Sequence, residues 1–111
     1  MIEKHHIIKR SQCSCIDYLL NYKQLTPSEH RGENGVHGKN GAAIDLEYKQ
    51  ALECDLRELF HQAEYSIEDI TRKLLANDKQ VQKAFKKVKQ GDKGYSKENI
   101  IKTLLGGRYY V

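Results

Sequence analysis

The chain has 111 residues, of which 39% are hydrophobic and 31% charged, and its formal net charge is +4. This length suits one domain with a modest core, and no apolar run approaches the ~20 residues that a membrane-spanning helix needs. The three cysteines form no even framework and no apolar leader opens the chain, so we expect a cytoplasmic protein with no membrane partner.

The N-terminal third predicts two short strands and a helix. Residues 2–9 contain the β-branched pair Ile7 and Ile8 and favour a strand, and residues 21–25 form a weaker second strand. Thr26 then suits a helix N-cap, Pro27 the first helical position and Glu29 a capping box. A short helix is therefore predicted to begin at Thr26.

A glycine-rich segment follows this helix. Half of the eight glycines fall at intervals of three between Gly32 and Gly41. Such a segment needs unusual backbone angles or a close backbone approach.

From Ile44 onward the spacing of apolar residues becomes helical. The pattern predicts a long helix over about 44–63, a second one capped by Ser66, a third over about 78–89, and a last one capped by Ser96. The residues after Gly107 are expected to return as an extended tail, with Tyr109 and Tyr110 packed against the hairpin. Cys54 is expected to be packed on the long helix, and no internal repeat is expected.

Charge is distributed unevenly along these segments. Residues 79–111 hold nine Lys or Arg against two acids, whereas residues 44–78 hold four against nine. A basic C-terminal third would attract a phosphate backbone, although a lysine-rich helix face is often only solvated.

Histidine supplies the first chemical signal. Four of the five histidines, namely His5, His6, His30 and His37, belong to the N-terminal third. Neighbouring residues on a strand point to opposite faces, so one member of the His5–His6 pair can bind a metal while the other faces a different part of one cleft. The fifth, His61, is expected to be structural.

These residues, taken with their spacing, resemble the HNH (ββα-metal) endonucleases of the compact, phage-associated kind. The resemblance covers about residues 3–42. It rests on the His5–His6 pair followed by Arg10, on the nine-residue interval from Asn21 to His30, and on His37 between Gly35 and Gly38. It implies two antiparallel strands and one helix around a single divalent cation.

The resemblance also implies a role for each residue. His5 and His30 would be metal ligands and His6 the general base, while Asn21 would brace the loop that holds the base. The third ligand is left open between His37, which we favour, and Asn34. Imidazole ligands suit Zn, Ni, Mn or Co, and Mg remains a candidate because cells supply it in excess.

The implied reaction is hydrolysis of a phosphodiester bond in DNA, with RNA not excluded. A neutral imidazole can take a proton from water near neutral pH, and by family analogy the products carry a 5′-phosphate and a 3′-hydroxyl. One such site cuts one strand, so a monomer should nick DNA. The candidate nucleic-acid contacts are Arg10, Lys39, Lys83, Lys86 and Lys87.

Two departures from the family pattern bear on these expectations. Many members hold a structural zinc with paired Cys-x-x-Cys motifs, but Thr26 and Glu29 occupy the corresponding positions here, so we expect no such zinc. Cys13 and Cys15 stand where similar members have two glycines, which puts the DNA contact of that loop in doubt.

We therefore expect an α+β fold, in which residues 1–43 form the ββα-metal motif and residues 44–111 form a helical segment that completes the same domain. An alternative function is a catalytically weak HNH scaffold that binds nucleic acid or a protein and regulates it. In that case the helical segment would supply the partner surface, and a homodimer is also open. A purely structural helical protein would bind no divalent metal tightly.

Overall fold

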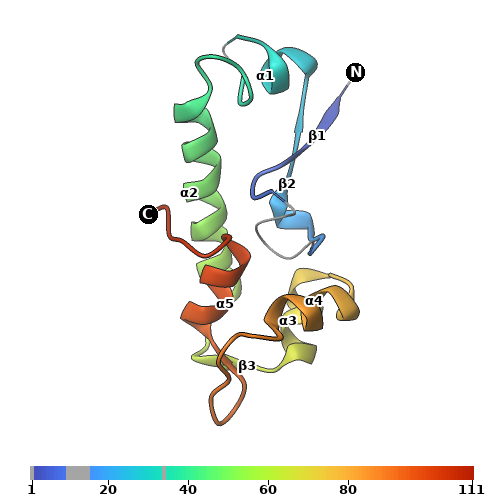
Figure 1. The fold of residues 1–111 in the computed structure, drawn as a ribbon, viewed down its shortest axis with the longest axis vertical. Helices are drawn as coiled ribbons and strands as arrows, with labels where there is room; N and C mark the ends of the chain where they lie inside the picture. Colours follow the sequence, from blue (N-terminus) through green and yellow to red (C-terminus); the bar gives the residue numbers. More distant parts are fainter. Residues whose placement is uncertain (1, 10–15, 34) are drawn as a thin grey trace.

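The computed structural model describes residues 2–9, 16–33 and 35–111. The molecule is elongated, with principal extents of 48 × 26 × 22 Å, and combines two small antiparallel sheets with helices (Figure 1). The strands are β1 (Glu3–His6), β2 (Tyr22–Leu25), β3 (Glu64–Tyr65) and β4 (Tyr95–Ser96). The helices are α1 (Pro27–Arg31), α2 (Ala42–Leu59), α3 (Ile67–Leu74), α4 (Asp78–Phe85) and α5 (Lys97–Leu104), with a 3₁₀ turn, η1 (Leu19–Asn21). The predicted α+β class is confirmed.

The first sheet is a hairpin of β1 and β2, with His6 opposite Tyr22 and Glu3 opposite Leu25. The predicted strand over 2–9 is shorter than expected. It ends at His6 because the next two residues form hydrogen bonds with Asn21. The carbonyl of Asn21 accepts from the Ile7 N–H at 2.9 Å, and its side chain pairs with the backbone of Ile8.

The capping box at the start of α1 is confirmed. The hydroxyl of Thr26 accepts from the Glu29 N–H at 3.2 Å, and the Glu29 carboxylate accepts from the Thr26 N–H at 2.9 Å. Pro27 occupies the first turn, where its missing N–H removes no hydrogen bond. The helix has only five residues and ends where the glycines begin.

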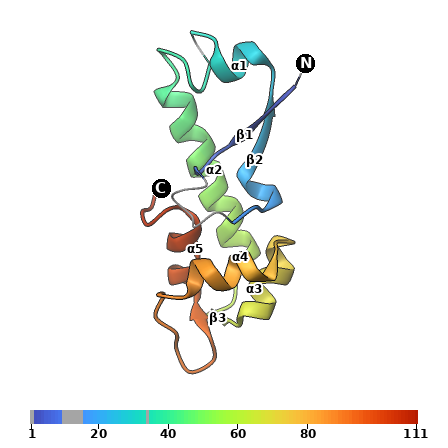
Figure 2. The same ribbon diagram turned by 45° about the vertical axis from the view of Figure 1, so that its right-hand side comes forward.

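Helix α2 runs along the length of the molecule and connects its two ends (Figures 1 and 2). It begins at Ala42, two residues earlier than predicted, and has 18 residues. Leu52 and Leu56 are buried on the predicted stripe, and Phe60 is buried just after the helix. No helix in the described ranges is long and apolar enough to cross a membrane.

The expectation of no internal repeat was wrong. Residues 65–75 and 95–105 are identical at six of eleven positions, in the shared order Tyr-Ser-x-Glu-x-Ile-x-x-x-Leu-Leu. In both copies the serine caps a helix, and Tyr65 pairs with Tyr95 between β3 and β4. The connection before the second copy, between α4 and β4, is longer than the one before the first, between α2 and β3. Neither connection has the spaced oxygen ligands of a calcium-binding helix–loop–helix.

One hydrophobic core joins the two ends of the chain. Ile7, Ile8, Ile16 and Tyr18, from the connection between the first two strands, belong to the same buried cluster as residues of α2, α3, α4 and α5. The hydroxyl of Tyr18 lies 3.5 Å from the Leu104 carbonyl oxygen. The helical segment therefore packs directly against the connection that leads from β1 to β2.

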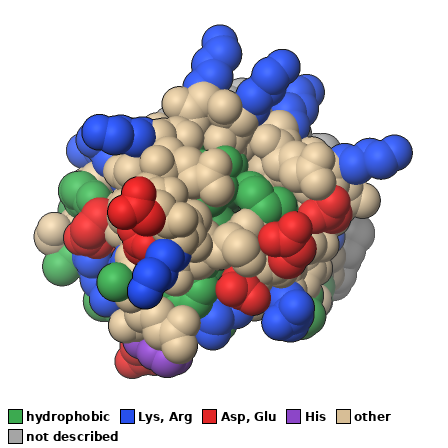
Figure 3. Space-filling model, turned by 90° about the horizontal axis from the view of Figure 1, so that it is seen from below, with side chains coloured by type: hydrophobic (Ala, Val, Ile, Leu, Met, Phe, Trp, Pro, Cys, Tyr) green, Lys and Arg blue, Asp and Glu red, His purple; other side chains and the backbone are tan. Residues whose placement is uncertain are grey.

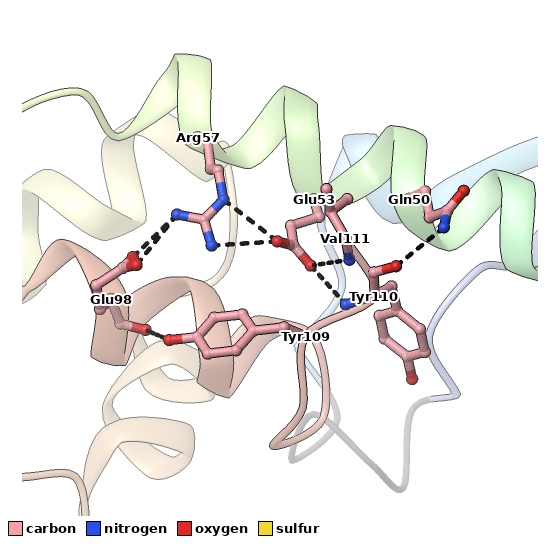
Figure 4. Close-up of polar contacts among 7 residues, drawn as sticks. All are labelled: Gln50, Glu53, Arg57, Glu98, Tyr109, Tyr110 and Val111. Atoms are coloured by element: carbon pink, nitrogen blue, oxygen red, sulfur yellow. Dashed lines mark hydrogen bonds and ion pairs between the residues drawn. The ribbon is translucent and has the colours of Figure 1, made fainter.

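The C-terminal tail lies along α2 rather than against the hairpin, so the predicted packing of Tyr109 and Tyr110 was wrong. Glu53, only 1% exposed, accepts from the backbone N–H groups of Tyr110 at 2.7 Å and Val111 at 3.3 Å (Figure 4). Its other oxygen accepts from Arg57, which also pairs with Glu98. The buried carboxylate of Glu53 holds the tail through these two N–H groups. The sequence did not indicate this contact because the partners are far apart along the chain. Cys54, expected to be packed, is exposed.

Candidate metal centre

Three histidines from three separate segments meet near the N-terminal end of α2. His5 comes from β1, His30 from α1 and His37 from the glycine-rich segment, and one ring nitrogen from each lies within 4.8 Å of the others. The ring centroids are 4.6–5.1 Å apart. Three imidazoles at this spacing can hold one metal ion.

The glycine-rich segment brings His37 beside His30. The N–H of His37 donates to the carbonyl oxygen of His30 at 2.8 Å, and the N–H of Val36 donates to the carbonyl oxygen of Glu29 at 2.8 Å. The segment thus coils back along α1. A Cβ on Gly38 would overlap the carbonyl oxygen of Gly32, so this close backbone approach requires glycine there.

His5 is the most enclosed of the three clustered histidines. Its side chain is 2% exposed, and its Nε2 has no hydrogen-bond partner among the described residues. Burial, followed by the neighbouring His37 and His30, lowers the pKa of His5 to about 4, and Asp45 opposes this shift. The ring is therefore neutral at physiological pH, the state that a metal ligand needs.

Glu3 orients His30, a role that the sequence analysis missed. Its Oε1 lies 2.9 Å from His30 Nδ1, and Arg31 holds the same carboxylate through two hydrogen bonds of 3.0 and 2.6 Å. The hydrogen bond from His30 and the charge of Arg31 lower the pKa of Glu3. A carboxylate on Nδ1 leaves Nε2 as the ligand atom. The available signal was the position of Glu3 two residues before His5, on the same strand face.

Asn21 and His6, the other two residues of the predicted site, lie in different surroundings. Asn21 is 1% exposed, and its side chain bridges the N–H and carbonyl of Ile8 at 2.7 and 2.9 Å. His6 lies outside the three-histidine group and packs edge-on against the ring of Tyr22, with centroids 4.7 Å apart. Their catalytic and bracing roles stay predictions.

A cavity of about 220 Å³ lies between β1, the glycine-rich segment and the start of α2. His5, His6 and His37 line it together with Asp45 and Lys49. Asp45 and Lys49, on the first turns of α2, form an ion pair at 2.8 Å, and neither was singled out from the sequence. The cavity thus has His6 and two of the three clustered histidines, His5 and His37, on one lining.

A larger hollow of about 610 Å³ lies beside Asp17 and Tyr22. Its lining is mostly apolar and includes Leu19 and Leu75, but none of the three clustered histidines. Titratable side chains converge instead on the smaller cavity.

The predicted nucleic-acid contacts are dispersed. Lys39 is exposed and lies 3.8 Å from Glu33. Lys83, Lys86 and Lys87 line a shallow hollow of about 410 Å³ on and just after α4, at the end of the molecule opposite α1 (Figure 1). Figure 3 views the molecule from below; several Lys and Arg side chains project along its upper edge, and others stand among Asp and Glu side chains elsewhere on this face.

Four residues with proposed or alternative roles, Arg10, Cys13, Cys15 and Asn34, lie outside the described residues. Comparison of the chain with protein families, with characterised proteins and with solved structures found no match.

Proposed function

We propose that this protein is a metal-dependent endonuclease of the HNH type, in which β1, β2 and α1 form the ββα-metal motif. The observation that carries the proposal is the convergence of His5, His30 and His37, with one ring nitrogen of each within 4.8 Å of the others. Segments that are 25 and 32 residues apart in sequence from His5 converge only through the fold. Histidines without a shared role would not be expected to converge in this way.

The residues present fit a divalent cation. The Nε2 of His5 is buried without a partner among the described side chains, and such an orphaned atom is costly unless something binds it. Three protein ligands leave coordination positions open for water and substrate, as in catalytic sites. When bound, a Mg, Mn, Ni, Co or Zn ion would stabilise charge on the scissile phosphate.

The chain itself would supply the proton transfer and the orientation. His6, on the wall of the same cavity, would accept a proton from the attacking water on a ring nitrogen. Asn21 would hold the backbone after His6 in place through its bonds to Ile7 and Ile8. Lys49, which also lines this cavity, would contact a phosphate oxygen of DNA.

The first experiment is a calorimetric titration of metal-free protein, followed by a supercoiled-plasmid nicking assay with Mg²⁺, Mn²⁺, Ni²⁺ or EDTA. We expect about one ion per chain and nicking that EDTA abolishes. His5→Ala should lose metal binding. His6→Ala should keep it and lose about 10²- to 10⁴-fold in nicking rate, whereas the exposed His61→Ala serves as the control. Absence of metal binding would refute the proposal.

A binding module is the second candidate function. The lysine-lined hollow at α4 lies away from the histidines and so can hold a phosphate backbone without cleavage. A His5→Ala, His6→Ala double variant that keeps full biological activity would favour this function over the nuclease.

A further inference from the structure

The surroundings of His6 contain an acidic neighbour that no motif indicated. The Oδ1 of Asp17 lies 3.8 Å from His6 Nε2. That nitrogen is buried and has no hydrogen-bond partner in the described part of the chain. The backbone carbonyl oxygen of Asn21 already accepts a hydrogen bond from the Ile7 N–H. Asp17 is thus the acidic group to which a proton on Nε2 can point.

Asp17 is itself held from two directions. The hydroxyl of Tyr22, on β2, donates to its Oδ1 at 2.6 Å, and the ring of Tyr22 packs edge-on against His6. The backbone N–H of Asp17 donates to Gln80 Oε1, on α4, at 3.0 Å. Ile16 and Tyr18, on either side, are almost fully buried.

We propose that Asp17 is the positioning residue for His6, and that the helical segment holds Asp17 in place through Gln80. A carboxylate facing Nε2 favours the tautomer with its proton on that nitrogen and fixes the plane of the ring. The other nitrogen, Nδ1, is then left as the proton acceptor. The catalytic consequence rests on the proposed nuclease function, but the tautomer does not.

The C-terminal helices help to hold the segment that carries Asp17. Residues 16–18 are clamped between β2 on one side and α4 and α5 on the other. Both ribbon views place η1, which directly follows them, next to the α3–α4 end of the molecule (Figures 1 and 2). The helices therefore set the position of the carboxylate that orients His6.

The test is long-range ¹H–¹⁵N correlation NMR of the histidine rings in the metal-free protein, at one fixed pH where His6 is neutral. We expect the wild-type ring to be mainly the Nε2–H tautomer. Asp17→Ala and Tyr22→Phe should give a mixture, and Asp17→Asn, which keeps an acceptor oxygen, should be intermediate. An unchanged His6 signal in Asp17→Ala would overturn the proposal.

Gln80 provides a remote test with a matched control. Gln80→Ala should shift the His6 tautomer in the same direction, whereas Gln82→Ala, on the same helix but bonded only locally to Asp78, should not. In the nicking assay with saturating metal, Asp17→Ala should lower kcat about 10- to 100-fold, with little change in KM or metal affinity. Equal effects of Gln80→Ala and Gln82→Ala would refute the link through α4.

The two proposals fail separately. If the NMR spectra change as expected but wild-type protein does not nick DNA with any metal, the positioning by Asp17 stands and the nuclease proposal fails. If nicking depends on His6 but the spectra of Asp17→Ala match wild type, the nuclease stands and Asp17 has no positioning role.

Discussion

At the scale of single residues, neighbouring groups set the orientation and the charge state of the clustered histidines. Glu3 fixes which nitrogen of His30 faces the centre, and burial keeps His5 neutral. A metal site built only from its ligands would have to orient each ring on binding, which costs conformational entropy. The structure provides this orientation in advance.

We predict that Glu3→Gln weakens metal binding about 10- to 100-fold, because the ring of His30 loses the carboxylate that orients it. Isothermal titration calorimetry of the metal-free protein measures the change. Glu33→Gln, which removes an exposed carboxylate from the glycine-rich segment, is the control and should bind metal as wild type does. Equal affinities of the Glu3→Gln variant and wild type would show that Arg31 and Glu3 form only a surface pair.

The low pKa of His5 predicts how stability depends on pH. The unfolded chain takes up a proton near 6.5, whereas the folded protein resists until about 4. The unfolded state thus binds more protons in this window, so the free energy of unfolding falls as pH decreases from about 6.5 to 4. Urea denaturation of metal-free protein at several pH values checks this.

His5→Gln should flatten that part of the profile, since the side chain that titrates is gone. Saturating metal should move the loss of stability to lower pH, because metal and protons compete for the same nitrogens. A wild-type profile identical to that of His5→Gln would contradict the assignment.

At the scale of elements, the two repeated helices end differently although both repeats finish with leucine. Leu75 and Leu105 are the last residues of the two repeats. Leu75 ends α3 in the left-handed conformation, with φ 55°, and is 79% exposed, whereas Leu105 has φ −89° and is fully buried. The same residue type is therefore strained in one copy and packed in the other.

We predict that Leu75→Gly stabilises the protein by about 0.5–1 kcal/mol, because glycine adopts the left-handed conformation without steric cost. Leu105→Gly should instead destabilise it by about 3–5 kcal/mol, because the core would lose a fully buried side chain. Chemical denaturation measures both. Leu75→Ala keeps the strain and should gain little; a gain equal to that of glycine would argue against strain relief as the cause.

At the scale of the whole molecule, the three clustered histidines and the lysine-lined hollow lie at opposite ends. The histidines lie near α1, and Lys83, Lys86 and Lys87 lie on or after α4. If DNA contacts those lysines, they contribute sequence-independent attraction and no chemistry. Binding and cleavage should then be separable by mutation.

We predict that Lys83→Ala, Lys86→Ala and Lys87→Ala together reduce the salt dependence of DNA binding. The slope of log affinity against log salt should fall by about 0.9 for each DNA phosphate that a lysine no longer neutralises. Metal affinity should stay unchanged. Fluorescence anisotropy at several salt concentrations is the measurement, and Lys102→Ala on α5 is the control. An unaltered slope would leave these lysines as a solvated face.

Local interactions could be predicted from the sequence alone. The caps at Thr26, Ser66 and Ser96 and the buried stripe of α2 were predictable because their partners lie within three or four residues along the chain. The choice of His5, His30 and His37 as ligands came from spacing and resemblance, and their proximity is now visible in the fold.

The contacts between distant segments are visible only in the folded chain. Glu3 with His30, Asp17 with Gln80, and Glu53 with the tail join residues 27, 63 and 57 positions apart. Such pairs form because burial leaves polar groups in need of partners, and which partner arrives depends on how the helices pack. The orientation of the histidines is therefore a property of the whole fold, although the histidines themselves belong to its first third.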